Sequence, residues 1–261
     1  MRAATLLLAA SLAMSAQAQQ PIKLYAAGSL RAALNEVAAS YTDAKVEAVY
    51  GASGLLRDRI AGGERADIFA SANMEHPHSL AKDGRAGPVK RFARNRMCAL
   101  AAPKVVLTTE NLLERLVDPA VAVGTSTPKA DPSGDYAWEL FEKAERIRPG
   151  SFAILSGKAR KLTGGPDSPP PPKDRNVYGV LVAEGKADIF LTYCTNAILA
   201  KAENAALQVV EVPANLAVAA DYGLVLLHGS GEPAYYFSQF ILSPKGQAIL
   251  MKYGFSPGEA R

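Results

Sequence analysis

Residues 63–69 read GERADIF, and residues 185–190 read GKADIF. In both copies a glycine ends a helical pattern, and the apolar residues after it enter a buried strand. A single helix–glycine–strand step is common in α/β proteins. Its return in the second half of the chain indicates two lobes of similar build.

Short apolar runs alternate with helical patterns around the first copy. The pattern predicts strands over residues 23–27, 45–50 and 67–70 and helices over residues 29–40 and 53–61. Strands and helices of this length in alternation are typical of α/β lobes with a mainly parallel sheet and flanking helices. Further along, residues 163–175 are rich in Gly and Pro, and we expect an extended surface loop there.

The first eighteen residues have the features of a signal peptide. Arg2 gives a positive start, residues 3–14 are apolar, and Ala16-Gln17-Ala18 fits the small-x-small cleavage pattern. The apolar run is shorter than a bilayer requires. We therefore expect the mature chain to begin near Gln19 and to be a soluble periplasmic protein.

The charge of the chain is nearly balanced. Lys and Arg number 29 against 25 Asp and Glu, and removal of Arg2 lowers the formal net charge from +4 to +3 (29 − 1 against 25). No block of Lys and Arg with interleaved aromatic residues occurs, which disfavours nucleic-acid binding. Cys98 and Cys194 can form a disulfide in an oxidising compartment, and two separate buried thiols are the alternative.

Ser or Asn stands at four predicted helix starts, namely Ser29, Ser53, Ser133 and Asn176, which precedes Val177. Taken singly, each is explained by helix capping. Taken together, they follow strands of an α/β protein, where ligands bind, and helix N-termini offer N–H donors and partial positive charge. The cluster therefore predicts an anion site that needs no Lys or Arg.

Six segments, taken in order, resemble the motifs of periplasmic molybdate-binding proteins. They are Ala26–Leu30, Gly51–Leu56, Ala66–Ala72, Asp131–Ala137, Asn176–Leu181 and Ile189–Tyr193. The resemblance extends from Lys23 to Phe255. It implies a two-lobed type II periplasmic binding protein. Lobe one would comprise residues 19–101 and 217–261, lobe two would comprise residues 102–216, and two segments would form the hinge.

In that family an oxyanion is held between the lobes, and the resemblance implies which residues hold it here. Ser29 and Ser53 correspond to the serines of lobe one. Ser133 and Val177 correspond to backbone N–H donors of lobe two, and Tyr193 corresponds to a tyrosine hydroxyl. Apart from the molybdenum of the ligand itself, the resemblance implies no metal and no cofactor.

Molybdate carries no proton near neutral pH, so a site of donors alone suits it, and tungstate as well. Phosphate still carries a proton and needs an acceptor, whereas sulfate is smaller and must be rejected by cavity size. The chain departs from the family pattern at Gly28, Gly54, Asp131 and Asp135. An inward carboxylate would repel a dianion or accept a proton from a phosphate- or arsenate-like ligand. Because turn aspartates usually serve turns and caps, we expect both to point to solvent.

We therefore expect a monomeric binding protein, not an enzyme, that delivers molybdate or tungstate to the membrane permease of an ABC importer. A binder of sulfate, phosphate or an arsenate-like anion is the alternative. An exported hydrolase is a weaker one, because the sequence has no nucleophile elbow and no P-loop. The run Glu75-His76-Pro77-His78 lacks a matching Cys or His cluster, so we expect a surface turn there and no metal site.

Overall fold

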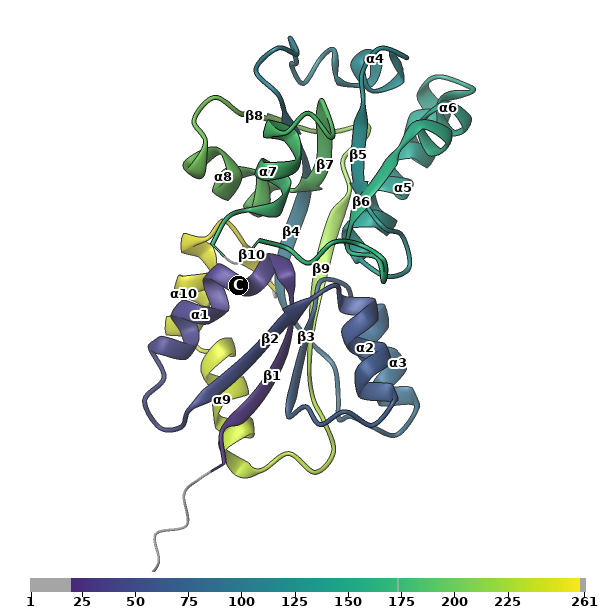
Figure 1. Ribbon diagram of the computed structural model, residues 1–261. Coiled ribbons are helices and arrows are strands. Elements are labelled where there is room, and N and C mark those ends of the chain that lie inside the picture. The colour runs from purple at the N-terminus through teal and green to yellow at the C-terminus, as the bar shows by residue number, and fades with distance from the viewer. Residues whose placement is uncertain (1–19, 173, 259–261) are drawn as a thin grey trace, which may run out of the picture.

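The computed structural model describes residues 20–172 and 174–258, which form two lobes of mixed α/β structure (Figure 1). The predicted signal peptide, residues 1–18, lies outside the described residues. Within those described ranges, no helix has the length and apolar character needed to cross a membrane.

The strand order in lobe one is β2-β1-β3-β9-β4. Strands β2, β1 and β3 pair in parallel, and β9 pairs antiparallel with β3 on one side and with β4 on the other. The short strand β10 pairs with β4. The strands span Ile22–Ala27 (β1), Val46–Gly51 (β2), Ile68–Ser71 (β3), Lys90–Ala101 (β4), Ala219–Leu226 (β9) and Ser256–Pro257 (β10). The helices span Gly28–Leu30 (η1), Arg31–Ala39 (α1), Ser53–Ala61 (α2), Glu75–Lys82 (α3), Glu232–Leu242 (α9) and Pro244–Lys252 (α10). Figure 1 shows α2 and α3 on one face of this sheet and α1, α9 and α10 on the other.

Lobe two repeats this plan with a smaller sheet. Strand β5 pairs in parallel with β6 and β7, whereas the second half of β4 runs antiparallel to β7 and β8. The strands span Val123–Ser126 (β5), Arg160–Thr163 (β6), Ile189–Tyr193 (β7) and Gln208–Glu211 (β8). The helices span Leu112–Val117 (α4), Pro132–Ile147 (α5), Ser151–Lys158 (α6), Val177–Ala183 (α7) and Cys194–Glu203 (α8).

The two lobes share strand β4. It pairs with β9 as far as Arg96 and with β7 and β8 from Met97 and Cys98 onward. The returning segment passes beside it, because the Met97 N–H donates to the Val218 carbonyl at 3.2 Å. The chain thus crosses between the lobes twice, within one continuous sheet, and each lobe has a mixed sheet whose parallel strands lie away from the crossing.

The doubled sequence pattern has a structural counterpart in both lobes. Gly63 and Gly185 have φ of +97° and +70°, a region that favours glycine, and the apolar residues after them are buried in β3 and β7. The repeated aspartate also has the same role twice. Asp67 Oδ2 accepts the Lys23 N–H at 2.7 Å, and Asp188 Oδ2 accepts the Ala122 N–H at 2.8 Å. Each aspartate stands directly before its own strand, and its carboxylate accepts a backbone N–H at the start of the neighbouring parallel strand.

The expected surface turn at Glu75-His76-Pro77-His78 is wrong. These residues form the first turn of helix α3, and His76 is buried. His76 and Leu80 stand four positions apart, so they share the face of α3 that is turned to the protein interior. Among the described residues, no group of three or more His, Cys, Asp or Glu side chains is placed to hold a metal ion.

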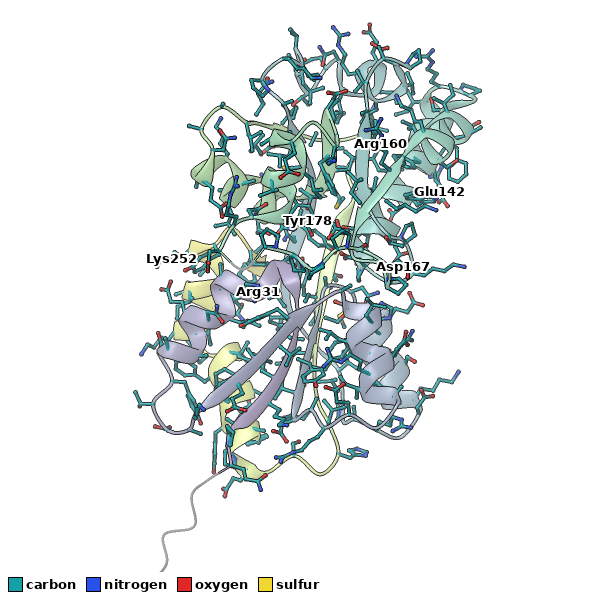
Figure 2. The ribbon with its side chains drawn as sticks, in the orientation of Figure 1. Arg31, Glu142, Arg160, Asp167, Tyr178 and Lys252 are labelled. Carbon is teal, nitrogen blue, oxygen red and sulfur yellow. A yellow bond between two sulfur atoms is a disulfide. The ribbon has the colours of Figure 1, made fainter. Side chains whose placement is uncertain are left out.

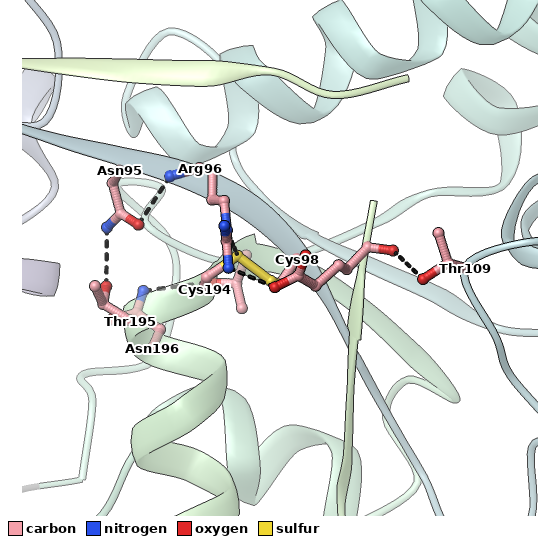
Figure 3. The surroundings of a disulfide bond; sticks show 9 residues. Asn95, Arg96, Cys98, Thr109, Cys194, Thr195 and Asn196 are labelled. Atoms are coloured by element: carbon pink, nitrogen blue, oxygen red, sulfur yellow. Dashed lines mark hydrogen bonds and ion pairs between the residues drawn. A yellow bond between two sulfur atoms is a disulfide. The ribbon is translucent and has the colours of Figure 1, made fainter. Parts of the chain in front are cut away.

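A disulfide joins β4 to helix α8 (Figure 3). Cys98 and Cys194 have Cα atoms 4.8 Å apart, although 96 positions separate them in the chain. Hydrogen bonds beside the disulfide join the same two elements. Arg96 Nε donates to Cys194 Sγ at 3.4 Å, and Asn95 Nδ2 donates to Thr195 Oγ1 at 2.9 Å. The start of α8, directly after Tyr193, is thereby fixed to the strand that crosses between the lobes.

Candidate anion-binding site

A cavity of about 440 Å³ lies between the two lobes. Lobe one contributes the ends of β1 and β2 and the helix starts that follow them, and lobe two contributes the ends of β6 and β7 and the start of α7. Figure 2 places Arg31 of lobe one and Tyr178 of lobe two at this region. The residues that line the cavity include Ser29, Ser53, Asp131, Gly164, Val177 and Tyr193.

The lobes touch each other directly beside this cavity. The Gly54 N–H donates to the Ala130 carbonyl at 2.9 Å, and the Tyr136 hydroxyl donates to the Ala72 carbonyl at 3.4 Å. A Cβ atom on Gly54 would lie 2.5 Å from the Lys129 carbonyl oxygen. Backbone meets backbone here, so the structure represents a closed arrangement of the lobes.

The two serines of lobe one do not act as helix caps. Ala52 is the N-cap residue of α2, and the Ser53 hydroxyl oxygen accepts the Ala72 N–H at 3.1 Å. The Ser29 and Tyr222 hydroxyl oxygens lie 2.9 Å apart. Each serine oxygen therefore has a partner within lobe one. The Ser53 hydroxyl proton is not used by that partner and can be donated to a ligand.

Two residues of lobe two have a hydrogen-bond donor without a partner among the described residues. Tyr193 is the last residue of β7, its side chain is 2% exposed, and its hydroxyl has no hydrogen-bond partner among the described residues. Burial raises the pKa of Tyr193 well above its ordinary value, so the hydroxyl keeps its proton. Val177 is the first residue of α7, whose cap is Asn176, and its N–H makes no bond to another described residue.

Ser133 does not line the cavity. It is the second residue of α5 and fully buried, and its N–H donates to Asp131 Oδ1 at 3.0 Å. The N–H that the family resemblance assigns to the anion is thus occupied by a carboxylate of the same chain. The structure brings Ser29, Ser53, Val177 and Tyr193 to one cavity. Ser133 is not among the residues that line it, whereas Asp131, which accepts its N–H, is.

The expectation that Asp131 points to solvent is wrong. Asp131 caps α5 and lines the cavity, where it lies against Gly164, so that a Cβ there would be 2.5 Å from Asp131 Oδ2. Burial raises the pKa of Asp131 to about 6 and the Asp135 charge adds to the rise, while the Ser133 N–H and the Ser126 hydroxyl oppose it. A carboxyl group therefore stands where the sequence predicted donors only.

Asp135 behaves differently. Its Oδ1 accepts the Lys129 N–H at 2.7 Å, and the side chain lines a second pocket beside Glu75 and Asp221 rather than the cavity between the serines. Burial raises the pKa of Asp135 as well. Of the two aspartates that depart from the family pattern, only Asp131 faces the proposed ligand.

The Gly- and Pro-rich loop after β6 is the part of the cavity that sequence reasoning missed. It is largely exposed, as expected, but Gly164, Gly165 and Pro169–Pro172 also form one wall of the cavity. Figure 1 shows the segment between β6 and α7 running across the space between the lobes. Its composition indicates irregular backbone but not position. In the sequence, the position of this loop is indicated only by the helix start at Asn176, which follows the loop directly.

The charged side chains on the cavity wall are of both signs. Arg31 and Arg175 line it, and so do Asp131, Asp174 and Glu203. The Arg31 guanidinium stacks over the Tyr50 ring, 4.7 Å from its centroid, which fixes that cation at the lobe-one side. An anion in this cavity would be attracted by the arginines as well as by the N-termini of α2 and α7.

Several relatives match nearly the whole chain, among them the following two. An uncharacterized protein of Pasteurella multocida, PM1146, is 34% identical, with 90% of this chain and 98% of that protein covered. The molybdate-binding protein ModA of Mycobacterium tuberculosis is 26% identical, with 95% of this chain and 89% of that protein covered.

Solved structures with this fold include proteins for different ligands. The periplasmic molybdate-binding protein of Azotobacter vinelandii has a TM-score of 0.72 at 20% identity, covering 90% of this chain and 98% of its own. The sulfate-binding protein SubI of M. tuberculosis has 0.74 at 17%, covering 92% and 87%. L-phospholactate-bound PEB3, a Campylobacter jejuni protein, has 0.68 at 16%, covering 90% and 98%.

These likenesses show the type II periplasmic binding protein fold. The family model described as bacterial extracellular solute-binding protein matches residues 22–256, which is almost every residue that the structure describes. The chain is a member of the bacterial extracellular solute-binding protein family.

Proposed function

We propose that this protein is the periplasmic receptor of an ABC importer and that it captures an oxyanion, with molybdate and tungstate as the first candidates. The observation that carries this proposal is the convergence of Ser29, Ser53, Val177 and Tyr193 on one cavity between the lobes. All four offer hydroxyl or backbone donors, and none brings a negative charge. The 26% identity to a molybdate-binding protein over most of the chain supports the same ligand.

Capture and delivery follow from the position of the cavity. A ligand that is held by Ser53 of lobe one and by Val177 and Tyr193 of lobe two binds the closed state better than the open one, so it shifts the population toward closure. In this proposal the closed monomer is then recognised by the membrane permease. Binding requires no cofactor and no nucleic acid, and the donors serve to hold the anion rather than to catalyse a reaction.

The size of the cavity favours a second candidate. In the measure that gives the cavity 440 Å³, one water takes about 10–15 Å³, so the four oxygens of a tetrahedral oxyanion take roughly 60 Å³ and fill only a small part of it. A cavity of several hundred Å³ suits an organic ligand. An organic phosphate would place its anionic group at the serines and its carbon skeleton along the Pro-rich wall. The structural likeness to a protein solved with L-phospholactate is consistent with this alternative.

Thermal unfolding with a panel of ligands tests both candidates. The mature protein is heated with molybdate, tungstate, sulfate, phosphate or phospholactate, and with sodium chloride at equal ionic strength as the control. A ligand at about a hundred times its Kd stabilises by roughly 2.7 kcal/mol, which raises Tm by several degrees. We expect rises with molybdate and tungstate. A rise with phospholactate alone would replace molybdate by an organic phosphate, and no rise with any anion would contradict the proposed function.

A further inference from the structure

We propose that Asp131 makes this protein bind its oxyanion together with one proton, which is held between a ligand oxygen and the Asp131 carboxyl group. This inference rests on the proposed function and adds the protonation state of the bound complex. It assigns Asp131 as a specificity-determining residue, although the sequence predicted that its side chain would lie in solvent.

The Asp131 carboxyl cannot easily leave the cavity wall. Its Oδ1 accepts the Ser133 N–H at 3.0 Å, and rotation away from the cavity would leave that buried donor unpaired. On its other side, Oδ2 packs against Gly164, which has a φ of +78°. The carboxyl is therefore still in place when a ligand enters, and in this proposal the ligand lies beside it.

In the described part of the chain, no positive side chain pairs with Asp131, although Arg31 and Arg175 line the same cavity. Asp135 on the same helix adds a negative charge. Asp135 apart, the nearby groups are neutral: the Asp131 charge helps to raise the pKa values of Tyr178 of α7 and Tyr193 of β7, so both hydroxyls keep their protons. Ser126 of β5 contributes only a hydroxyl. Among the described residues, no Lys, Arg or His forms an ion pair with Asp131. An ionised Asp131 next to a dianion would therefore place two like charges together in a partly buried site.

One proton removes this conflict. Burial already raises the pKa of Asp131 to about 6 without a ligand, and a bound dianion raises it further because it disfavours a second negative charge. The protonated carboxyl then donates an O–H···O⁻ hydrogen bond to the anion, a short and strong type of bond. The repulsive group becomes a fifth donor, beside Ser29, Ser53, Val177 and Tyr193.

The source of the proton depends on the ligand. Molybdate has none near neutral pH, so Asp131 must take one from solvent when molybdate binds. Hydrogen phosphate, or a protonated organic phosphate, brings its own, and the ionised Asp131 accepts it. Both complexes have one proton between the two oxygens, but the complex with hydrogen phosphate carries one more negative charge than the complex with molybdate. The two ligands differ in whether a proton is taken up from the buffer.

The test is isothermal titration of the mature wild-type protein and Asp131→Asn at pH 5.5 to 8, in two buffers with different ionisation enthalpies. For wild type with molybdate, we expect close to one proton taken up per ligand at pH 8. We also expect a Kd that rises about tenfold per pH unit above pH 6. Hydrogen phosphate should bind at pH 8 without this uptake. Asp131→Asn should bind molybdate with no proton uptake and little pH dependence, because its amide donates without titrating.

Three variants serve as controls for the assignment of the proton to Asp131. Asn and Ser are both good N-caps, so Asp131→Asn and Asp131→Ser retain the start of α5. Asp135→Asn removes the neighbouring carboxylate that lies outside the cavity, and it should keep the proton uptake. Molybdate binding with the same Kd at pH 6 and pH 8 and no uptake would overturn the inference and leave the proposed function standing. Failure of wild type and all three variants to bind any oxyanion at any pH would overturn the proposed function first, and the inference with it.

Discussion

The Gly54 N–H of lobe one donates to the Ala130 carbonyl of lobe two at 2.9 Å, so the two backbones meet without a side chain between them. A Cβ on Gly54 would lie 2.5 and 2.7 Å from the carbonyl oxygens of Lys129 and Ala130. We predict that Gly54→Ala keeps the fold but prevents full closure, and that oxyanion affinity falls at least about tenfold, or roughly 1.4 kcal/mol. Titration calorimetry and small-angle scattering with and without ligand measure the two effects.

Gly157→Ala is the matched control for this substitution. Gly157 also lies in a helix, α6, and a Cβ there would meet nothing within 4 Å. It should leave both affinity and ligand-induced compaction unchanged. Normal binding by Gly54→Ala would mean that the lobes need not approach as closely as they do here.

The two serines of lobe one should matter for binding more than for stability. We predict that Ser29→Ala and Ser53→Ala each weaken oxyanion binding by about ten- to a hundredfold, because a hydrogen bond to a charged group contributes roughly 1.5–3 kcal/mol. Ser53→Ala also leaves the buried Ala72 N–H without its partner, so a stability loss of about 1 kcal/mol accompanies it.

Ser243→Ala distinguishes loss of binding from loss of a helix cap. The Ser243 hydroxyl caps α10 by accepting the Gly246 N–H, so this variant should lose about 1 kcal/mol of stability and keep the full thermal shift with ligand. Equal ligand shifts in all three serine variants would remove Ser29 and Ser53 from the site.

Tyr193→Phe removes a buried hydroxyl that lines the cavity and has no hydrogen-bond partner among the described residues. We predict weaker oxyanion binding with unchanged or slightly higher stability without ligand, because the buried hydroxyl has no hydrogen-bond partner to lose. Tyr41→Phe, in a ring cluster with Phe237 and Phe240, serves as the control and should bind normally. Affinity is read by calorimetry and stability by urea unfolding. A stability loss without any change in affinity would assign Tyr193 to packing alone.

Asp131 should also make the stability of the ligand-free protein depend on pH. Its pKa is raised in the folded state to about 6, so the fold favours the protonated form. The stabilising contribution is then fully present below the unfolded pKa near 4 and is lost as pH rises through 6. We predict that Asp131→Asn raises Tm relative to wild type at pH 7.5 and much less at pH 4.5. An equal difference at both pH values would contradict the pKa argument.

The disulfide should stabilise the whole molecule. Cys98 and Cys194 are separated by 96 positions, and closing a loop of this length is worth up to about 4–5 kcal/mol in the chain-entropy model. We predict that the double variant Cys98→Ala and Cys194→Ala unfolds at a clearly lower urea concentration than the oxidised protein. A reductant should lower the midpoint of wild type and leave that of the double variant unchanged. Identical midpoints for oxidised and reduced wild type would contradict a stabilising bridge.

The parts of the fold that depend on local pattern could be predicted from sequence. The GERADIF and GKADIF copies indicated matching strands, and Asp67 and Asp188 indeed make matching bonds to the neighbouring strand. The start of α7 at Val177 was likewise readable from its cap Asn176, and α2 does begin at Ser53, although Ser53 does not cap it. Helix–strand alternation and turn chemistry are local properties, so a short window contains the information.

What could not be predicted depends on contacts between distant segments. Asp131 was recognisable as a turn or cap residue, and its bond to the Ser133 N–H is local, but it also packs against Gly164, which follows only after α5, α6 and β6 in the chain. The position of the Pro-rich wall depends in the same way on closure of the two lobes. Neither relationship can be inferred from a short stretch of sequence. Family resemblance did not help at Asp131, because the chain departs from the family there.

Strand β9 lies between β3 and β4, although it follows them in the chain only after the whole of lobe two. Lobe one therefore cannot complete its sheet until residues 219–226 arrive, whereas strands β5, β6 and β7 come from one uninterrupted stretch. Pairing between strands this distant in sequence is slow, because the entropy cost of closing a long loop comes before the contacts that stabilise the pair. During folding we expect lobe two to become ordered first and lobe one to be the late half. Ligand capture, which needs groups from both lobes, would then be the last property that the molecule acquires.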